Sequence, residues 1–233
     1  MTARRRFYKT VSVTADLGIA LDGRVVKTPL KSPLQLPSQA LADAVAAEWA
    51  GQGEKLVPAT MPFTKLANTA IDRVATHRAA ITAEILEFAG SDLVCYRAET
   101  PDALAARQRK HWDPVIAWAL AALDAPFETR IGVMHRPQAP AAIAAVNQAL
   151  AGFTAFEIAA FYTVMTLTGS ALIPLMLAHG ALTADAGWLA AHVDEDFQIE
   201  NWGQDDEAAA RRLRRHAEYL ACCRFMELAK PSG

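Results

Sequence analysis

The chain has 233 residues, of which 52% are hydrophobic and 21% charged, with a formal net charge of −2 and a pI of about 6.3. This composition excludes a disordered chain. It also excludes a broad positive field of the kind that holds nucleic acid or an anionic membrane. The cysteines are odd in number and two are adjacent, which argues against a disulfide framework and favours a reducing compartment. They are Cys95, Cys222 and Cys223.

The first thirty residues carry the strand signals of the chain. Residues 7–13 are rich in aromatic and β-branched side chains, and an apolar segment follows at 17–21. Asp22 and Gly23 form a hairpin turn signal, because glycine adopts positive φ without steric cost. Residues 24–28 supply the return strand. The sequence therefore predicts a small antiparallel β element at the N-terminus.

A helix is expected over residues 38–52. Ser38 has the side chain of an N-cap and follows a proline-rich stretch that keeps the backbone out of helix. Leu41, Val45 and Trp49 recur every four residues and share one face, which predicts an amphipathic helix.

From Pro62 onward the pattern is helical almost throughout, with one further strand candidate at residues 127–133. We predict an α+β fold that is predominantly α, with a small β-containing N-terminal domain (1–60) and a larger helical domain (61–233). The expected helices are 64–74, 79–89, 101–110, 113–123, 140–150, 153–168, 171–179, 185–202 and 206–228.

No targeting or membrane segment is expected. The basic run Arg4 to Arg6 is not followed by the apolar stretch of a secretory signal. Residues 153–177 are the most apolar later stretch, but Glu157 and Pro174 interrupt it, so we interpret it as buried helix. We expect no insertion into a membrane.

The sequence lacks the motifs of common catalytic sites. The six histidines form no HExxH pattern, no serine lies in a GxSxG turn, and no glycine-rich phosphate loop is present. Cys95 lies in an apolar context typical of an inert core thiol. We predict a protein that is not an enzyme and uses no cofactor. The alternative is a small-molecule enzyme whose histidines and carboxylates are brought together only by the fold.

An acidic segment at residues 194–207 allows three interpretations. Asp205, Asp206 and Glu207 suit the first turn of a helix, where the dipole favours acids, and Glu207 is spaced to pair with Arg211. The same acids would also suit a partner-binding surface. Carboxylates are ligands for Mg²⁺ or Ca²⁺, but the spacing is not that of an EF-hand, so metal is the least favoured interpretation.

Several segments, taken in order along nearly the whole chain, resemble the chaperone family that assembles the F1 sector of ATP synthase by acting on its α subunit. No single motif is diagnostic, but the ordered set is fairly specific. The segments are Leu21-Asp22-Gly23-Arg24, Val26-Lys27-Thr28-Pro29, Glu48-Trp49, Met61-Pro62, Leu66-Ala67-Asn68-Thr69-Ala70-Ile71-Asp72, Asp92-Leu93-Val94-Cys95-Tyr96-Arg97, Trp112-Asp113-Pro114, Thr168-Gly169-Ser170, Phe197-Gln198 and Trp202-Gly203.

The resemblance implies a two-domain assembly chaperone that binds the unassembled F1 α subunit and yields it to the β subunit. It implies no ATP hydrolysis and no cofactor, and it points to the acids after Trp202. We expect a monomer in the bacterial cytoplasm, or a mature form in the mitochondrial matrix. Tryptophan is favoured in binding hot spots. The predicted partner-binding residues are Trp49, Glu200, Trp202, Asp205, Asp206 and Glu207.

Overall fold

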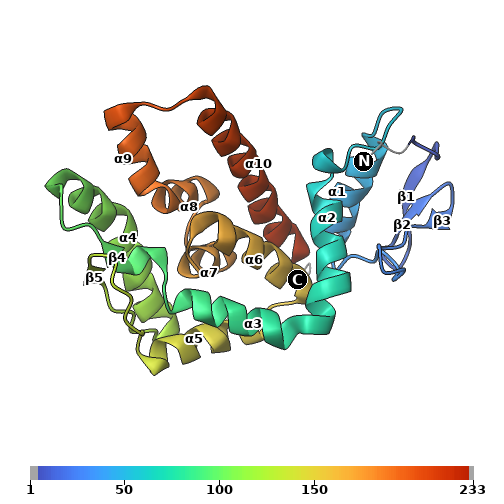
Figure 1. Cartoon of the computed structure of the whole chain (residues 1–233). Helices are drawn as coiled ribbons and strands as arrows, with labels where there is room; N and C mark the ends of the chain where they lie inside the picture. The colour runs from blue at the N-terminus through green and yellow to red at the C-terminus, as the bar shows by residue number, and fades with distance from the viewer. Residues whose placement is uncertain (1–4, 231–233) are drawn as a thin grey trace. The chain divides into compact units, whose positions relative to one another are not determined.

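The computed structural model describes residues 5–230, so Arg4 of the basic run lies outside the described part. The chain forms two compact units (Figure 1). Unit 1 comprises Met1–Arg78, Thr154–Ala160 and Ala221–Gly233, and unit 2 comprises the two stretches Ala79–Phe153 and Phe161–Leu220. Each unit is thus assembled from separate stretches of chain. The division into 1–60 and 61–233 stays a prediction about folding domains.

Unit 1 contains the predicted β element. β1 (Val11–Val13), β2 (Ile19–Leu21) and β3 (Arg24–Val25) form an antiparallel sheet in that order, which packs against α1 (Figure 1). Leu21 pairs with Arg24, leaving a two-residue turn. Both turn residues have positive φ, 49° at Asp22 and 76° at Gly23. This is the turn that the twist of a hairpin favours, so the prediction is confirmed.

Helix α1 (Gln39–Ala50) begins where the sequence predicted. The Ser38 side chain accepts a hydrogen bond from the Leu41 amide at 3.1 Å, which satisfies one free N–H of the first turn. Leu41 and Val45 are buried, and Trp49 is half-buried at the end of the same face. The predicted stripe is therefore the face that packs inward.

A carboxylate of α1 caps the next helix of unit 1. After the short 3₁₀ turn η1 (Pro58–Thr60), α2 (Pro62–Thr69) begins with a proline. The Glu48 carboxylate accepts hydrogen bonds from the Phe63 amide at 2.6 Å and the Thr64 amide at 2.8 Å. Burial raises the pKa of Glu48. The acid thus orders the start of α2 from a neighbouring helix.

The helix pair predicted at 64–74 and 79–89 continues from α2. The π turn η2 (Ala70–Val74) follows α2, and α3 (Ala75–Ala89) follows η2. His77 has non-helical backbone angles, with φ −123° and ψ 26°. The two predicted helices are therefore present, with an irregular joint between them.

In unit 2, a single helix replaces two predicted ones. Helix α4 (Asp102–Leu123) contains Pro114 in its interior, so the predicted helix start at this proline is wrong. A proline inside a helix costs about 3 kcal/mol or more. Trp112 and Val115 flank it and are almost fully buried, and burial contributes roughly 1.5–3 kcal/mol for each large side chain. The Trp112 Nε1–H also donates to the carbonyl of Ala190 at 2.6 Å. Tertiary packing therefore offsets the local cost.

The strand candidate at 127–133 is much shorter than predicted. Only β5 (Arg130–Ile131) is formed, and it pairs in parallel with β4 (Tyr96–Arg97), which follows the 3₁₀ turn η3 (Leu93–Cys95).

The remaining helices lie close to their predicted ranges, with one exception. The expected helix over 185–202 is divided at His192, whose φ is −117° and ψ is 20°. Its ring stacks on Trp188, with 3.7 Å between ring centres, and its Nδ1–H donates to the Trp188 carbonyl at 2.9 Å. These contacts hold His192 outside helical geometry. The helices are α5 (Pro140–Ala151), α6 (Ala155–Thr168), α7 (Leu172–Ala178), α8 (Ala184–Ala191), α9 (Val193–Trp202) and α10 (Asp206–Ala229).

The fold class is α+β and mostly helical, as predicted, with its three-stranded sheet near the N-terminus. Ile19 and Leu34 are fully buried in unit 1, and Trp112 and Phe161 are fully buried in unit 2. Each unit therefore has apolar side chains withdrawn from water. Within residues 5–230, no helix has the length and apolarity to cross a membrane.

Candidate partner-binding surfaces

The predicted acidic segment joins two helices of unit 2. Helix α9 ends at Trp202, and Gly203 follows with a φ of 80°, a conformation that favours glycine. Helix α10 begins at Asp206. The Asp205 carboxylate accepts a hydrogen bond from the Ala208 amide at 2.8 Å, which is N-cap geometry. The capping interpretation is confirmed for Asp205.

The next two acids, Asp206 and Glu207, are exposed. Glu207 lies 3.8 Å from the Arg211 guanidinium, one helical turn on, so the predicted pair is present. Asp206 forms no ion pair with any residue from 5 to 230. Both acids lie in the first turn of α10, where negative charge is favourable. Capping needs only one of the three acids, so the Asp206 carboxylate is available to a partner, while the exposed Glu207 carboxylate also faces Arg211.

Large apolar side chains are exposed on α8, α9 and α10. The exposed fraction is 76% for Trp202, 69% for Leu213 and 49% for Leu189. An exposed tryptophan beside exposed carboxylates has the composition of an interface hot spot with a polar rim.

Glu200 takes part in a two-point ion pair on the surface of unit 2. Its carboxylate oxygens accept hydrogen bonds at 2.8 and 2.6 Å from the two terminal nitrogens of Arg107 on α4. The hydrogen bonds from Arg107 lower the pKa of Glu200. The guanidinium also lies 5.7 Å from the centre of the Phe197 ring. Glu200 is therefore held in place by α4 rather than left free.

A cavity of about 470 Å³ beside Glu200 combines His111 with the carboxylates of Asp196 and Glu200. This combination bears on the alternative of an enzyme with a histidine–carboxylate site. Burial lowers the pKa of His111. Asp196 is paired with Arg212, and Glu200 with Arg107. Both lining carboxylates are thus neutralised by guanidinium groups, which disfavours a role as general base.

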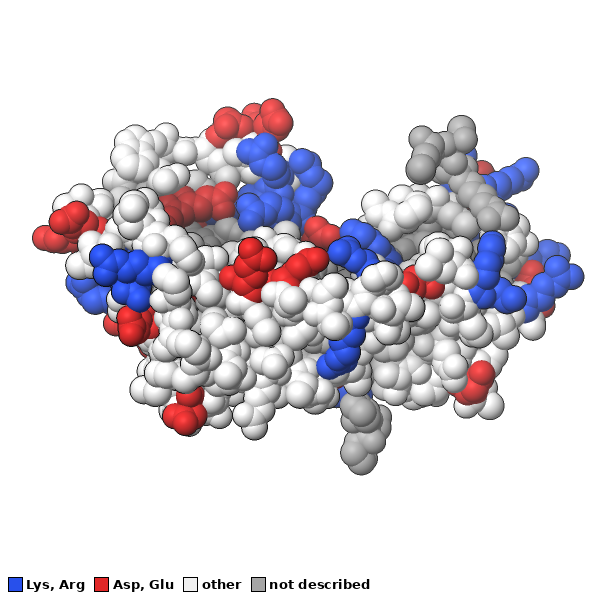
Figure 2. All heavy atoms as spheres, turned by 60° about the horizontal axis from the view of Figure 1, so that its bottom comes forward, with Lys and Arg blue, Asp and Glu red and all other residues white. Residues whose placement is uncertain are grey.

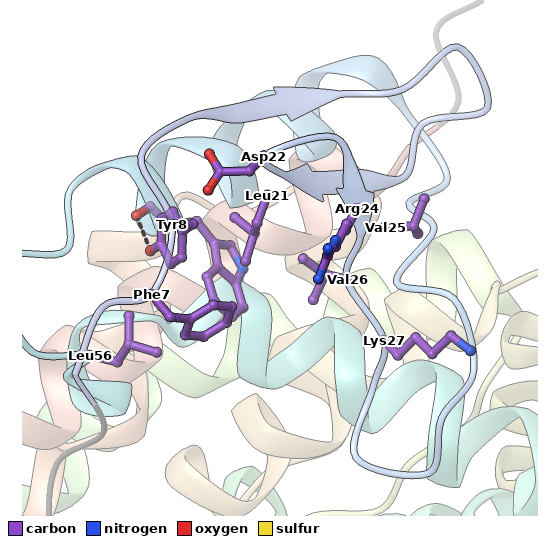
Figure 3. A pocket seen from close by; sticks show the side chains of 10 residues that line it. Phe7, Tyr8, Leu21, Asp22, Arg24, Val25, Val26, Lys27 and Leu56 are labelled. Carbon is purple, nitrogen blue, oxygen red and sulfur yellow. Dashed lines mark hydrogen bonds between the residues drawn. The ribbon is translucent and has the colours of Figure 1, made fainter.

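Trp49 lies in unit 1 and lines a groove of about 630 Å³. Its backbone carbonyl accepts a hydrogen bond from the Tyr8 hydroxyl at 2.6 Å, and the two rings meet edge to face at 5.8 Å. Figure 3 shows Phe7, Leu21 and Val26 around the same hollow. Trp49 is therefore both a core anchor and part of a surface groove.

The predicted residues fall into two sets. Glu200, Trp202 and the three acids belong to unit 2, whereas Trp49 belongs to unit 1. Sequence reasoning missed Arg107, which lies 93 residues from Glu200, and no local signal links the two. It also missed the cations of the groove beside Trp49.

Metal-binding and reactive groups are scarce in residues 5–230. No group of three or more histidine, cysteine or acidic side chains is arranged to hold a metal there. The three cysteines are buried, and burial raises the pKa of Cys95, as expected for a core thiol. Figure 2 shows acidic and basic side chains interspersed on one face, without a field of one sign.

Comparison with known proteins gives consistent matches. The family model for the ATP12 chaperone protein matches residues 5–120. The crystal structure of Atp12 from Paracoccus denitrificans superposes with a TM-score of 0.92 at 36% identity, covering 97% of this chain and 99% of that one. An aspartate-to-lysine mutant of the same protein gives a TM-score of 0.91 at 36% identity, covering 97% and 98%. The Atu1473 protein from Agrobacterium tumefaciens, described as a candidate chaperone, gives a TM-score of 0.91 at 45% identity, covering 97% of this chain and 86% of that one.

Fold and similarity together define the class of protein as a chaperone that acts in assembly. The chain belongs to the ATP12 chaperone family, whose members serve the assembly of F1-ATPase.

Proposed function

We propose that this protein binds the unassembled α subunit of F1-ATPase, prevents its aggregation and releases it to the β subunit. The observation that carries the proposal is the surface at the α9–α10 junction, where Trp202 is 76% exposed and is followed by acids that the helix does not need for capping. A subunit awaiting assembly exposes its interface, and a chaperone must cover that interface reversibly.

The surface suits reversible binding. A large aromatic side chain supplies contact area, and exposed carboxylates supply charge complementarity that sets orientation and association rate. Trp49 is proposed as a second contact, from unit 1. Glu200 is proposed as a rim residue whose position Arg107 maintains.

The first experiment is suppression of aggregation. Denatured F1 α subunit is diluted into buffer with and without the chaperone, and light scattering is followed. The β subunit and an unrelated aggregating protein serve as control clients. We expect scattering to fall for the α subunit alone, near one chaperone per client. Equal protection of all three would indicate a general holdase, and no protection by a well-folded chaperone would refute the proposal.

Charge reversal tests the acids. We expect Asp206→Lys combined with Glu207→Lys to weaken protection of the α subunit while the thermal midpoint changes little. The matched control is Asp185→Lys, because Asp185 is also an exposed acid in the first turn of a helix. Each reversal costs about 0.3–1 kcal/mol against the helix dipole. The double variant also loses the pair between Glu207 and Arg211, so its thermal midpoint should fall somewhat further than that of the control. Equal effects of test and control on protection would make the acids structural.

We further propose that the protein acts as a monomer in the bacterial cytoplasm, with the mitochondrial matrix as the alternative. The support is that the similar solved proteins are from bacteria. Sedimentation equilibrium of the purified chain tests the monomer, and a concentration-dependent dimer would contradict it.

A further inference from the structure

The groove of unit 1 has the size and lining of a site for a peptide side chain. Its volume is about 630 Å³, within the range of pockets that bind ligands. Tyr8, Trp49 and Leu56 contribute apolar lining from outside the sheet, and Leu21 and Val26 contribute from the hairpin. Figure 3 shows Tyr8, Leu21, Val26 and Leu56 around the opening of the groove.

Two exposed cations lie at this groove without acidic partners. Arg24 and Lys27 both line it, and neither forms an ion pair with any residue from 5 to 230. Figure 3 shows them extending from the return strand of the hairpin and the segment after it. Their charges are therefore available to a bound molecule.

The acid in the groove is already satisfied. The Asp22 carboxylate accepts hydrogen bonds from the Thr10 amide at 2.8 Å, the Thr10 hydroxyl at 2.9 Å and the Lys9 amide at 3.1 Å. The bonds from Thr10 and Lys9 lower the pKa of Asp22. Asp22 is thus engaged in holding the segment before β1, and the net charge of the lining is positive.

Arg6 adds a further positive charge beside the aromatic wall. Its guanidinium lies 4.6 Å from the centre of the Tyr8 ring. Within the described part of the chain it donates hydrogen bonds only to backbone carbonyls, among them those of Tyr8 and Ala50. A carbonyl accepts a hydrogen bond but does not neutralise charge, so Arg6 strengthens the attraction for an anion.

Trp49 supplies an unused hydrogen-bond donor. Its indole Nε1 is buried and has no acceptor among residues 5–230. A buried donor without an acceptor costs about 1–3 kcal/mol. The donor is enclosed by protein atoms, so the groove offers an occupant the ring of Trp49 rather than its N–H.

We propose that this groove binds an extended peptide segment that places a large apolar side chain against Trp49 and a carboxylate against Arg24 and Lys27. The inference rests on the proposed function, since the segment would belong to the unassembled client. Unit 1 would then prefer acidic apolar segments, whereas the acids of the α9–α10 junction prefer basic ones. The protein would recognise its client through two surfaces of opposite charge.

A defined peptide tests the groove without any client. The probe is the fluorescein-labelled octapeptide Gly-Ser-Asp-Phe-Leu-Asp-Ser-Gly, and fluorescence anisotropy measures its binding to the full chain. Two matched peptides replace both Asp by Asn, or Phe and Leu by Ala. We expect the parent peptide to bind and each replacement to weaken binding by about fivefold. Equal binding of all three peptides would overturn the inference.

Protein variants locate the site. Arg24→Glu and Lys27→Glu should each weaken binding of the parent peptide by about fivefold or more, because the new carboxylate repels the aspartates of the peptide. Trp49→Phe keeps an aromatic ring but reduces the apolar surface against which the segment packs, and should weaken binding by about threefold. The control is Arg109→Glu, an exposed cation on α4 in unit 2. Thermal midpoints confirm folding, and an equal loss in the control would overturn the inference.

The two proposals fail separately. If Arg24→Glu loses the peptide but still protects the F1 α subunit fully, the groove plays no part in client binding and the inference is overturned, while the proposed function stands. If the wild type binds the peptide but does not protect the α subunit, the chemistry of the groove is supported and the proposed function is overturned.

Discussion

The carboxylate of Asp92 accepts a hydrogen bond from the backbone amide of Leu172, 80 residues along the chain, at 3.0 Å. The same oxygen accepts from the Ala171 amide at 2.7 Å, and the other oxygen accepts from the Val94 amide at 3.1 Å. Asp92 has no exposed surface, and burial raises its pKa to about 6. One side chain therefore caps both η3 and α7 in unit 2.

Removal of the Asp92 carboxylate should destabilise the fold strongly. Asp92→Ala would leave the amides of Ala171 and Val94 buried without their acceptor, whereas the Leu172 amide would keep the Ser170 hydroxyl at 3.2 Å. Each unsatisfied buried group costs about 1–3 kcal/mol, so we expect a loss of about 2 kcal/mol or more in the free energy of unfolding. Urea denaturation at pH 7 measures it. A loss below about 1 kcal/mol would show that the loop relaxes and that the amides find other acceptors.

Asp92 should also make stability depend on pH. Its folded-state pKa of about 6 exceeds the ordinary value of 3.8. Between pH 3.8 and pH 6 the folded chain therefore binds more protons than the unfolded chain. This difference contributes about 3 kcal/mol to the free energy of unfolding. The contribution is fully present below about pH 4 and is lost as the pH rises through 6. The measurement is the difference in unfolding free energy between wild type and Asp92→Asn at several pH values. A constant difference from pH 4 to 7 would contradict the prediction.

The hairpin turn should tolerate few residues at Gly23. Its φ is 76°, and nothing lies within 4 Å of an added Cβ, so backbone strain alone decides the effect. We expect Gly23→Val to cost about 1–2 kcal/mol or more, and Gly23→Asn to cost less, because asparagine enters this region more readily. Thermal unfolding of both variants checks the order. Equal losses of stability in the two variants would show that something other than the positive φ requires glycine at position 23.

Gly187 lies so close to Tyr219 that alanine would force a side chain to shift. A Cβ at this position would overlap the Tyr219 hydroxyl oxygen, and that hydroxyl donates a hydrogen bond to the Ala184 carbonyl at 2.8 Å. Alanine in place of helical glycine normally stabilises by up to about 1 kcal/mol. Here we expect Gly187→Ala to destabilise by about 1–3 kcal/mol.

A double variant isolates this contact. Tyr219→Phe removes the clashing oxygen, so Gly187→Ala should cost less in that background than in the wild type. Chemical denaturation of the four proteins gives the coupling energy. Strict additivity would show that the hydroxyl is not the obstacle.

Local patterns were sufficient where the physical cause is local. The Asp22–Gly23 turn follows from the backbone freedom of glycine, and the start of α1 follows from the Ser38 hydroxyl. The Asp205 cap is likewise visible in the sequence, because an acid three residues before a free amide is enough to satisfy it.

Patterns failed where distant packing outweighed a local preference. Pro114 predicts a helix start, but the burial of Trp112 and its bond to Ala190 keep α4 continuous. The break at His192 has a nearer cause, because its ring stacks on Trp188 only four residues earlier, and the hydrophobic pattern gives no sign of that contact.

The sequence by itself determined the fold class, the hairpin, most helices and the position of the acidic segment at the start of α10. These features depend on neighbours within a few residues. Only the tertiary structure decided how the site residues are used. It left Trp202 exposed, bound Glu200 to Arg107 and placed Trp49 in a groove with Arg24. Exposure and pairing depend on which distant segments meet, and that information is spread over the whole chain.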